Sequence, residues 1–185
     1  MRTPTDFDYH YFDDPNAHGY QGYERDALGD QITYPWEAVA SYCERQGVTS
    51  AVDLGCAKGF LVEVLIKHGI AAQGFDISEY ALSFARTLPC QQRDVRDGIP
   101  VSADAIIATG VLIYLHESEL SSVLSDIYQS TRLLFILSAH YEGDRQVIPD
   151  AMRRITRPRS WWRSTIESHG FSFRHHDLYF DAYAK

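Results

Sequence analysis

Cysteine is scarce in this chain of 185 residues, and its count argues against a protein built on disulfides. There are three cysteines, Cys43, Cys56 and Cys90. Small secreted domains depend on several paired cysteines, whereas free thiols persist in a reducing compartment. The sequence therefore favours a cytoplasmic location.

Long apolar runs are missing as well. The first residues are polar, acidic and aromatic, which is unlike the apolar centre of a secretory leader. The longest apolar run, residues 105–115, is too short to cross a bilayer as a helix. We therefore expect no signal peptide and no membrane association. The sequence also carries no internal repeat and no low-complexity tract.

Basic charge is in deficit. Lysine and arginine number 17 against 25 aspartates and glutamates, a net charge of −8. Nucleic-acid-binding proteins usually present a basic face, and the only local candidate is Met152 to Arg163. We therefore expect no nucleic-acid partner. Hydrophobic residues at 45% and charged residues at 23% are typical of a globular domain with a substantial core.

What the chain does contain is a strand, a small-residue turn and a helix in direct succession. Residues 51–59 read AVDLGCAKG, and the following FLVEVLIKHG has apolar residues at helical spacing. Gly55 and Gly59 lack a Cβ atom, so the backbone there can approach a ligand closely. This geometry is typical of nucleotide-like ligands bound at a helix start. Asp53 lies at the strand end, where its carboxylate can reach polar ligand groups.

A second acidic residue follows one βαβ unit later. Residues 71–78 read AAQGFDIS, a short strand that ends at Asp76, 76 − 53 = 23 residues after Asp53. In a doubly wound sheet the two acids lie at the ends of neighbouring strands. A carboxylate there can accept hydrogen bonds from both hydroxyls of a ribose. The alternative, that Asp76 caps the next helix, is weakened because Ser78 suits that role.

These two segments resemble the first two motifs of class I methyltransferases that depend on S-adenosylmethionine (SAM). The first motif there is an acid followed by Gly-x-x-x-Gly, usually with a third glycine where this chain has Ala57. The dinucleotide fingerprint Gly-x-Gly-x-x-Gly fits less well, because only Gly55 of its three glycines is present. A dehydrogenase is therefore a distant alternative.

The resemblance implies an α/β, Rossmann-like class I methyltransferase fold. Its mostly parallel seven-stranded sheet has helices on both faces, and only FSFRHHDLYFDAYAK remains for the last two strands, so we expect a possible shortening at the C-terminus. Residues 35–185 would form the SAM-binding domain. A polar edge strand over 88–94, buried strands over 102–108 and 132–139, and helices over 35–47 and 160–169 complete the expected order.

The resemblance also implies which residues contact SAM. Asp53 and Gly55 would lie near its methionine part, and Asp76 would bind the ribose. Asp94 and Val95 would lie beside the adenine, although Asp94 suits a solvated loop equally well. The full set of expected cofactor-binding residues is Tyr23, Asp53, Gly55, Cys56, Ala57, Gly59, Phe60, Asp76, Ile77, Ser78, Asp94, Val95, Thr109, Gly110 and Val111. We expect no metal, since adjacent His175 and His176 point to opposite faces of a strand and have no accompanying ligands.

The N-terminal segment 1–34 differs from the rest in its density of tyrosine, phenylalanine, aspartate and histidine. It is either an aromatic lid over the binding site or a surface arm at an interface. Residues 19–26, GYQGYERD, resemble an N-terminal element of some class I methyltransferases in which tyrosines border the cofactor and the acceptor. This resemblance implies that Tyr23 borders the cofactor, while Tyr11, Tyr20 and Arg25 would contact the acceptor.

Candidate catalytic residues follow the fourth and fifth strands, at the edge of the sheet where open α/β folds bind ligands. Tyr114 and His116 follow the fourth strand, and His140 and Tyr141 follow the fifth. Either histidine can act as a general base near neutral pH. His116 can equally cap the next helix. We expect Tyr114, His116 and His140 to be catalytic and Tyr141 to bind the acceptor.

The sequence therefore predicts a SAM-dependent methyltransferase that modifies O or N of a small-molecule acceptor, as a monomer or homodimer, with S-adenosylhomocysteine (SAH) as product. Two alternatives stay open. One is an enzyme of the same fold that cleaves or cyclises SAM itself and releases methylthioadenosine. The other is a SAM-binding module without catalysis. The spacing of residues in the sequence does not identify the acceptor, because acceptor contacts come from loops.

Overall fold

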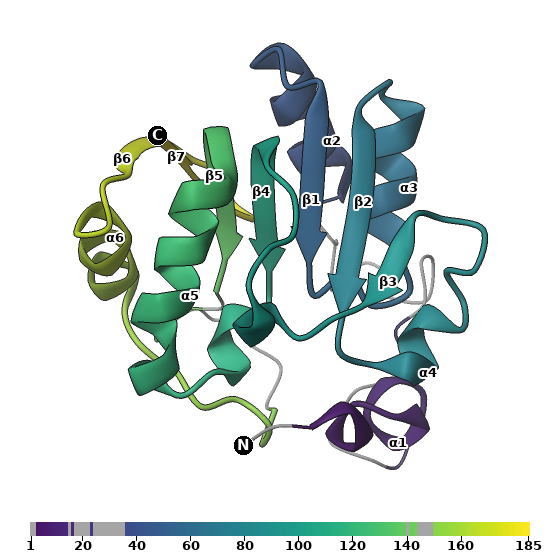
Figure 1. Cartoon of the computed structure of the whole chain (residues 1–185). Coiled ribbons are helices and arrows are strands. Elements are labelled where there is room, and N and C mark those ends of the chain that lie inside the picture. The colour runs from purple at the N-terminus through teal and green to yellow at the C-terminus, as the bar shows by residue number, and fades with distance from the viewer. Residues whose placement is uncertain (1–2, 15, 17–22, 24–35, 140, 144–149) are drawn as a thin grey trace.

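A seven-stranded sheet with the order β3-β2-β1-β4-β5-β7-β6 forms the centre of the protein (Figure 1). The computed structural model describes residues 3–14, 16, 23, 36–139, 141–143 and 150–185. Only β7 runs antiparallel to its neighbours β5 and β6. The strands are β1 (Ser50–Leu54), β2 (Ala71–Asp76), β3 (Cys90–Gln92), β4 (Ala103–Thr109), β5 (Thr131–Ser138), β6 (Ser172–His176) and β7 (Asp181–Ala184).

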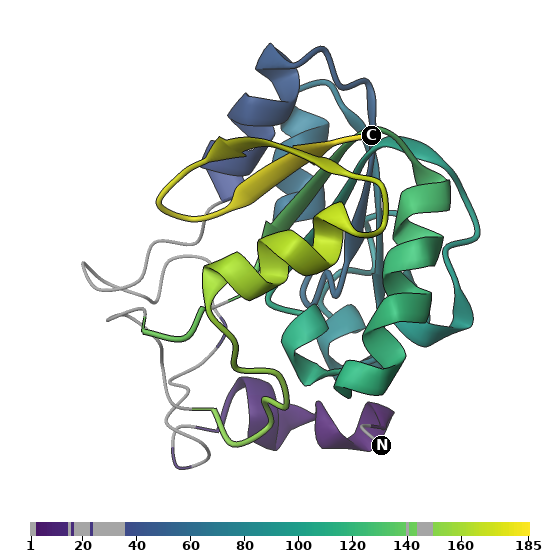
Figure 2. The same cartoon turned by 90° about the vertical axis from the view of Figure 1, so that its left-hand side faces the viewer.

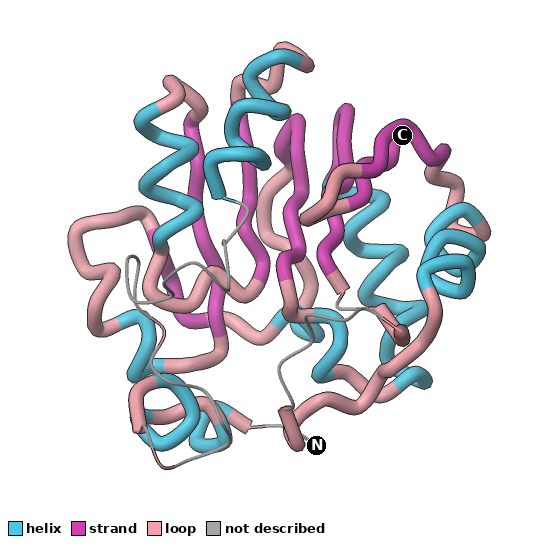
Figure 3. Tube along the Cα trace, turned by 180° about the vertical axis from the view of Figure 1, so that it is seen from behind, coloured by secondary structure: helices cyan, strands magenta, loops and turns pink. Residues whose placement is uncertain are grey.

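Helices cover both faces of the sheet. Seen from behind, α2 (Trp36–Arg45) and α3 (Phe60–Lys67) lie in front of the strands, and α5 (Glu117–Ser130) covers the opposite face (Figures 1 and 3). Helix α6 (Arg159–Glu167) leads into the β6–β7 hairpin (Figure 2). The shorter elements are η1 (Pro4–Asp6), α1 (Tyr9–Phe12), α4 (Glu79–Leu82), η3 (Val95–Asp97) and η4 (Leu112–Tyr114).

The central strands are apolar on both faces because both faces are covered. Along β4, Ile106 packs into the core beneath α5, whereas its neighbour Ile107 packs into the core beneath α2 and α3. Phe135 and Ile136 of β5 divide in the same way. All four side chains are fully buried. This two-sided burial explains the near-continuous apolar runs of the sequence and confirms the predicted parallel sheet.

The C-terminal end of the sheet is complete, so the possible shortening does not occur. Strand β7 lies between β5 and β6, with Ile136 opposite Ala182 and Phe173 opposite Tyr183. The edge strand β6 alternates between exposed and half-buried positions, whereas the first three residues of β7 are buried. A weakly apolar edge strand gives little sequence signal, which is why the strand was hard to predict.

Short helical turns lie outside the main elements. The helix that Ser78 is expected to cap is a single turn, α4, which ends at Leu82. The N-terminal segment contains a turn of 3₁₀ helix, η1, and a turn of α helix, α1. Asp8 begins α1 by accepting the backbone N–H of His10 at 2.8 Å. In Figures 1 and 2, α1 lies beneath the carboxyl ends of the parallel strands.

Within the described ranges, none of the helices has the length and apolar character needed to traverse a bilayer.

Candidate functional site

The turn after β1, residues 55–59, is called the glycine turn below. Gly55 and Gly59 have φ values of 71° and 79°, in the left-handed region that favours glycine. Ala57 also has a positive φ, 47°. Alanine is strained in this region, which gives a physical reason for the third glycine of the usual motif. The backbone N–H groups of Gly55 and Cys56 donate to the carbonyl oxygen of Phe75, at 2.7 and 3.1 Å, and so fasten the turn to β2.

The space beside the two glycines is occupied by other parts of the chain. A Cβ atom on Gly55 would lie 2.6 Å from Cβ of Val111, in the loop after β4. A Cβ atom on Gly59 would lie 2.8 Å from Cδ1 of Leu88, just before β3. The glycines therefore allow the end of β1, the start of β3 and the loop after β4 to meet, in addition to any close approach of a ligand. Thr109 ends β4, and Gly110 then donates its N–H to Ser138 of β5 at 2.7 Å.

Asp53 is a buried carboxylate with an unused oxygen. Its side chain precedes the glycine turn and is 2% exposed, and Oδ1 has no hydrogen-bond partner among the described residues. Burial raises the pKa of Asp53 well above its usual value, and the nearby Cys90 and Asp76 raise it further. A buried carboxylate of this kind is stabilised in its ionised form only by a cation or a hydrogen-bond donor. The structure therefore leaves Asp53 suited to a positively charged ligand group.

Asp76 organises the second strand end. Its Oδ2 accepts the N–H of Ala57 at 2.8 Å, and its Oδ1 accepts the N–H of Ser78 at 2.7 Å. Burial raises the pKa of Asp76 in spite of these hydrogen bonds. Each carboxylate oxygen has a further lone pair, so both can still accept a ligand hydroxyl. Ser78 caps α4 by accepting the N–H of Ala81 at 2.9 Å, as its position predicted.

Asp94 is engaged by an arginine. It precedes η3, where its carboxylate forms an ion pair with Arg96, and Arg96 also contacts Glu119 of α5 at 3.3 Å. Burial would raise the pKa of Asp94, but the hydrogen bonds from Arg96 outweigh it and lower the pKa. Val95 packs against the core beneath α5. A ligand amine at Asp94 would therefore share the carboxylate with Arg96.

The N-terminal residues 3–14, called the N-terminal cover below, pack onto this edge of the sheet. Phe7, Tyr11 and Phe12 form one buried cluster with three residues from elsewhere, Ala57, Ala81 and Met152. The Ser78 hydroxyl donates to the carbonyl oxygen of Phe7 at 2.5 Å. The described part of the N-terminal segment thus lies against the glycine turn and the start of α4.

A buried ion pair holds the N-terminal cover in place. Lys58, inside the glycine turn, is 2% exposed, and its Nζ lies 2.8 Å from Oδ1 of Asp13. The hydroxyl of Tyr80 donates to Oδ2 of the same carboxylate at 2.6 Å. Burial would raise the pKa of Asp13, but these donors outweigh it and lower the pKa. Sequence reasoning missed both Lys58 and Asp13, since nothing in their spacing links residues 45 positions apart.

A second polar cluster joins two predicted tyrosines to an unpredicted acid. The hydroxyls of Tyr11 and Tyr114 lie 2.6 Å apart, and both donate to Oδ2 of Asp150, at 3.2 and 2.8 Å. The side chain of Asp150 is 5% exposed. The structure thus brings Tyr114, from the loop after β4, together with Tyr11 from the N-terminal cover.

Tyr23 and Phe60 lie together beside the glycine turn. Their rings stack 5.6 Å apart, and Trp36 contacts Phe60 edge-on at 5.1 Å. The backbone N–H of Tyr23 donates to Phe12 of the N-terminal cover at 2.9 Å. Ile77 packs against the same buried cluster as Phe12. The predicted cofactor-binding residues Tyr23 and Ile77 therefore pack against the same buried cluster, and Phe60 stacks on Tyr23.

The other predicted residues divide into three groups. His116 is exposed at the N-cap of α5, where its backbone N–H donates to Glu119 at 2.8 Å. Tyr141 is buried, and its hydroxyl donates to Asp181 of β7. Tyr20, Arg25 and His140 lie outside the described residues.

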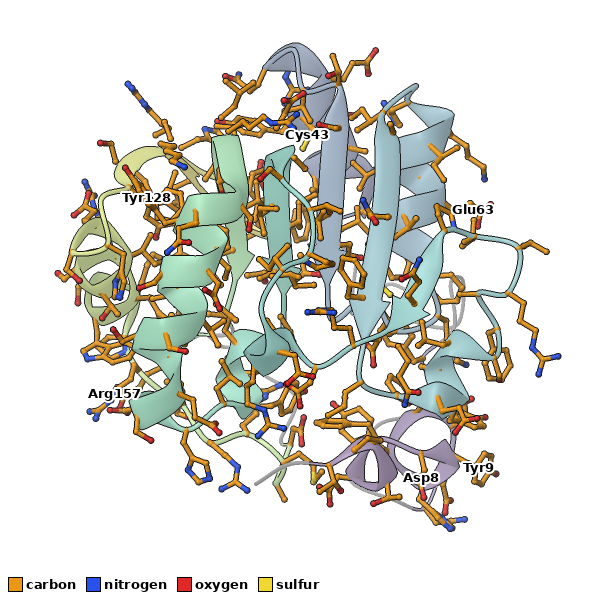
Figure 4. The ribbon with its side chains drawn as sticks, viewed as in Figure 1. Asp8, Tyr9, Cys43, Glu63, Tyr128 and Arg157 are labelled. Atoms are coloured by element: carbon orange, nitrogen blue, oxygen red, sulfur yellow. The ribbon has the colours of Figure 1, made fainter. Side chains whose placement is uncertain are left out.

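Asp8 and Tyr9 lie below the carboxyl ends of the strands, and Cys43 lies at the opposite end (Figure 4). Across the residues that the structure describes, no three His, Cys, Asp or Glu side chains are grouped so as to hold a metal ion.

Part of the chain is similar in sequence to a known protein family. Residues 52–133 match a family model described as a methyltransferase domain. No curated protein sequence matches the chain significantly.

Solved structures share the fold over most of the chain. Magnesium protoporphyrin IX methyltransferase (ChlM) from Synechocystis PCC 6803 with bound SAH is 18% identical, with a TM-score of 0.67, over 85% of this chain and 89% of that chain. The same enzyme with bound SAM is 20% identical, with a TM-score of 0.65, over 86% and 87%. Human N-acetylserotonin methyltransferase (ASMT) in complex with SAM is 19% identical, with a TM-score of 0.62, over 82% of this chain and 51% of that chain.

Proposed function

We propose that this chain, which has the class I methyltransferase fold and matches a methyltransferase domain model over residues 52–133, is a SAM-dependent methyltransferase acting on O or N of a small molecule. The sulfonium of SAM makes its methyl carbon open to direct displacement by such an acceptor. The task left to the protein is to bind SAM, align the acceptor and receive a proton.

The buried Asp53 carboxylate is the observation that carries this proposal. Its Oδ1 is buried without a hydrogen-bond partner among the described residues, two positions before the glycine turn. The amino group of the methionine part of SAM is a cationic donor of the kind this oxygen lacks. Asp53 and Gly55 would hold that part of the cofactor, so the residues present fit SAM.

The neighbouring strand ends supply the remaining contacts. Asp76 keeps a lone pair on each oxygen and would bind the ribose hydroxyls. Asp94 and Val95 would lie beside the adenine, with Asp94 shared with Arg96. The loop at Thr109 to Val111 touches the glycine turn through Val111 and would line the cofactor from the side of β4.

The acceptor would be bound between the loop after β4 and the N-terminal cover. Tyr114 and Tyr11 meet there on Asp150, and an acceptor proton passed to the Tyr114 hydroxyl has a carboxylate ready to receive it. His116 and His140 are the other candidate bases, and Tyr20, Arg25 and Tyr141 would contact the acceptor. The solved structures of similar fold carry names of methyltransferases for magnesium protoporphyrin IX and N-acetylserotonin, which supports a small-molecule acceptor here.

Product analysis tests the proposal. The purified chain is incubated with SAM, alone and with a panel of phenols, carboxylic acids and amines, and the nucleoside products are separated. SAH formed only with an acceptor, together with a methylated acceptor, supports the methyltransferase. Methylthioadenosine formed without an acceptor would instead indicate an enzyme that cleaves or cyclises SAM. SAM bound but unchanged under all conditions would indicate a binding module.

A further inference from the structure

Two cysteines from different elements meet beneath the glycine turn. Cys56 is part of that turn, and Cys90 is the first residue of β3. A Cβ atom on Gly74 of β2 would lie 2.6 Å from Sγ of Cys56 and 3.0 Å from Sγ of Cys90. Both sulfur atoms therefore pack against the same side-chain-free position, and each thiol lies close enough to shift the pKa of the other.

The two thiols are not equivalent. Cys56 is buried at 3% exposure, and its pKa lies well above the usual value, with the hydrogen bond to Cys90 and burial as the main causes. Cys90 is half-buried, and the hydrogen bond from Cys56 lowers its pKa. A partly exposed thiol that is favoured as thiolate is the arrangement of a nucleophilic cysteine, and a second thiol in contact is the arrangement of a resolving partner.

We propose that Cys56 and Cys90 form a reversible oxidation site, at which a peroxide closes a disulfide between the glycine turn and the edge strand β3. The Cys90 thiolate attacks one peroxide oxygen and the O–O bond breaks, which leaves a sulfenic acid on Cys90 and a hydroxide. The hydroxide takes up the proton that the Cys90 thiol had released and becomes one water. The Cys56 sulfur then attacks the Cys90 sulfur, and the hydroxyl leaves as a second water with the Cys56 proton. Both sulfurs are oxidised by one peroxide, and a dithiol reverses the reaction.

The position of the pair gives the disulfide a consequence for the cofactor, and this part rests on the proposed function. Bond formation draws the two sulfurs together to about 2 Å. Cys56 lies between Gly55 and Ala57, and Sγ of Cys90 lies 3.3 Å from a Cβ atom placed on Gly59. The movement would therefore displace the glycine turn and the strand that leads to Asp94. We expect oxidation to weaken SAH binding.

Cysteine mapping of the whole chain tests the site. The protein is treated with a few equivalents of hydrogen peroxide, its free thiols are alkylated, and its peptides are analysed without reduction. The expected result is a Cys56–Cys90 cross-linked peptide, with Cys43 recovered as the alkylated thiol. Dithiothreitol should restore both thiols. Recovery of Cys56 and Cys90 as free thiols, or as separate sulfinic acids, would overturn the proposal.

Two variants and one binding measurement complete the test. The Cys90→Ser variant should bind SAH like the parent but lose both the cross-link and the effect of peroxide. Cys43→Ala is the matched control and should keep both the cross-link and the effect of peroxide. Cys43 is a fully buried thiol on α2, at the far end of the sheet (Figure 4), and burial raises its pKa to about 12. In the parent, SAH affinity should fall about tenfold on oxidation, and a disulfide that leaves affinity within about twofold would refute the coupling. If the reduced protein binds no SAH, the cofactor assignment fails, while the peptide mapping still decides the oxidation site.

Discussion

The glycine turn and the N-terminal cover meet at the same edge of the sheet but are held there by different interactions. The turn is fixed by backbone geometry: positive φ at Gly55, Ala57 and Gly59, and N–H groups that donate to β2. The cover is fixed by side chains from distant parts of the chain, above all Asp13 on the buried Lys58. The turn should therefore fail through local strain, whereas the cover should detach while the sheet stays folded.

The largest effect is expected from a side chain added to the turn. Gly55→Ala places a Cβ atom 2.6 Å from Val111 at a φ of 71°. Backbone strain and overpacking together should lower the free energy of unfolding by about 4 kcal/mol. Urea unfolding followed by circular dichroism measures this change. Gly47→Ala is the control, since φ there is 74° but nothing lies within 4 Å of the added atom. Its loss should be about 1 kcal/mol, and equal losses for both variants would contradict the contact with Val111.

The next effect concerns the N-terminal cover. Asp13→Asn leaves the buried ammonium of Lys58 without its counter-ion, which should cost about 2 kcal/mol of docking free energy. Because Tyr11 and Phe12 are buried while the cover is docked, chymotrypsin should cut there more than about tenfold faster in the variant. Timed digestion followed by mass spectrometry gives the rate.

Asp14→Asn is the matched control for Asp13→Asn. Asp14 forms an ion pair with the exposed His10 at 2.9 Å and accepts the backbone N–H of its near neighbour Asn16 at 2.9 Å, and exposed ion pairs contribute little. Digestion of this variant should match the parent. If Asp13→Asn is also digested like the parent, the ion pair does not hold the cover.

A smaller effect is expected on cofactor affinity. Asp76→Ala removes the acceptor proposed for the ribose hydroxyls, so SAH affinity should fall about tenfold or more in a calorimetric titration. Asp104→Ala is the control. Asp104 also accepts backbone N–H groups, from Thr49 at 2.9 Å and Ser50 at 3.2 Å, but it lies at the start of β4, at the opposite end of the sheet. An affinity within about twofold of the parent for Asp76→Ala would remove the ribose assignment.

The smallest expected effect is the release of a proton when SAH binds. Burial raises the pKa of Asp53, so part of the free protein carries a protonated carboxyl, and a bound cation would favour the ionised form. SAH binding should therefore release up to about one proton and strengthen as pH rises toward that pKa. Titrations in buffers of different ionisation enthalpy count the protons. Asp53→Asn should abolish the release, and equal proton counts for parent and variant would place the cation elsewhere.

The raised pKa of Asp53 also makes the stability of the ligand-free protein depend on pH. The unfolded chain ionises this carboxyl near its usual pKa, before the folded chain does. Stability should therefore decline as pH rises through the window between the usual and the raised pKa, and Asp53→Asn should reduce that decline.

The sequence was informative where structure depends on local pattern. The apolar runs predicted the buried strands, and the spacing from Asp53 to Asp76 predicted neighbouring strand ends, because one βαβ unit fixes that distance. The glycine pattern predicted the turn, and the structure adds that Val111 and Leu88 occupy the space beside it.

The rest depends on contacts that no spacing encodes. From the sequence alone, Lys58 is expected to be an ordinary exposed residue of a turn. Its burial follows from the docking of Asp13, which lies 45 positions earlier. Asp150 joins Tyr11 and Tyr114 across 139 and 36 positions. Such clusters form only when the whole chain is folded, so they are seen in the structure and not in the sequence.

The central claim is that the edge around Asp53 binds SAM, and the most direct test is a calorimetric titration of the purified chain with SAH, with NAD as the comparison ligand. We expect one binding site for SAH, with a dissociation constant of about 1 to 100 μM, and no heat of binding from NAD. Binding of NAD alone, or of neither ligand, would contradict it.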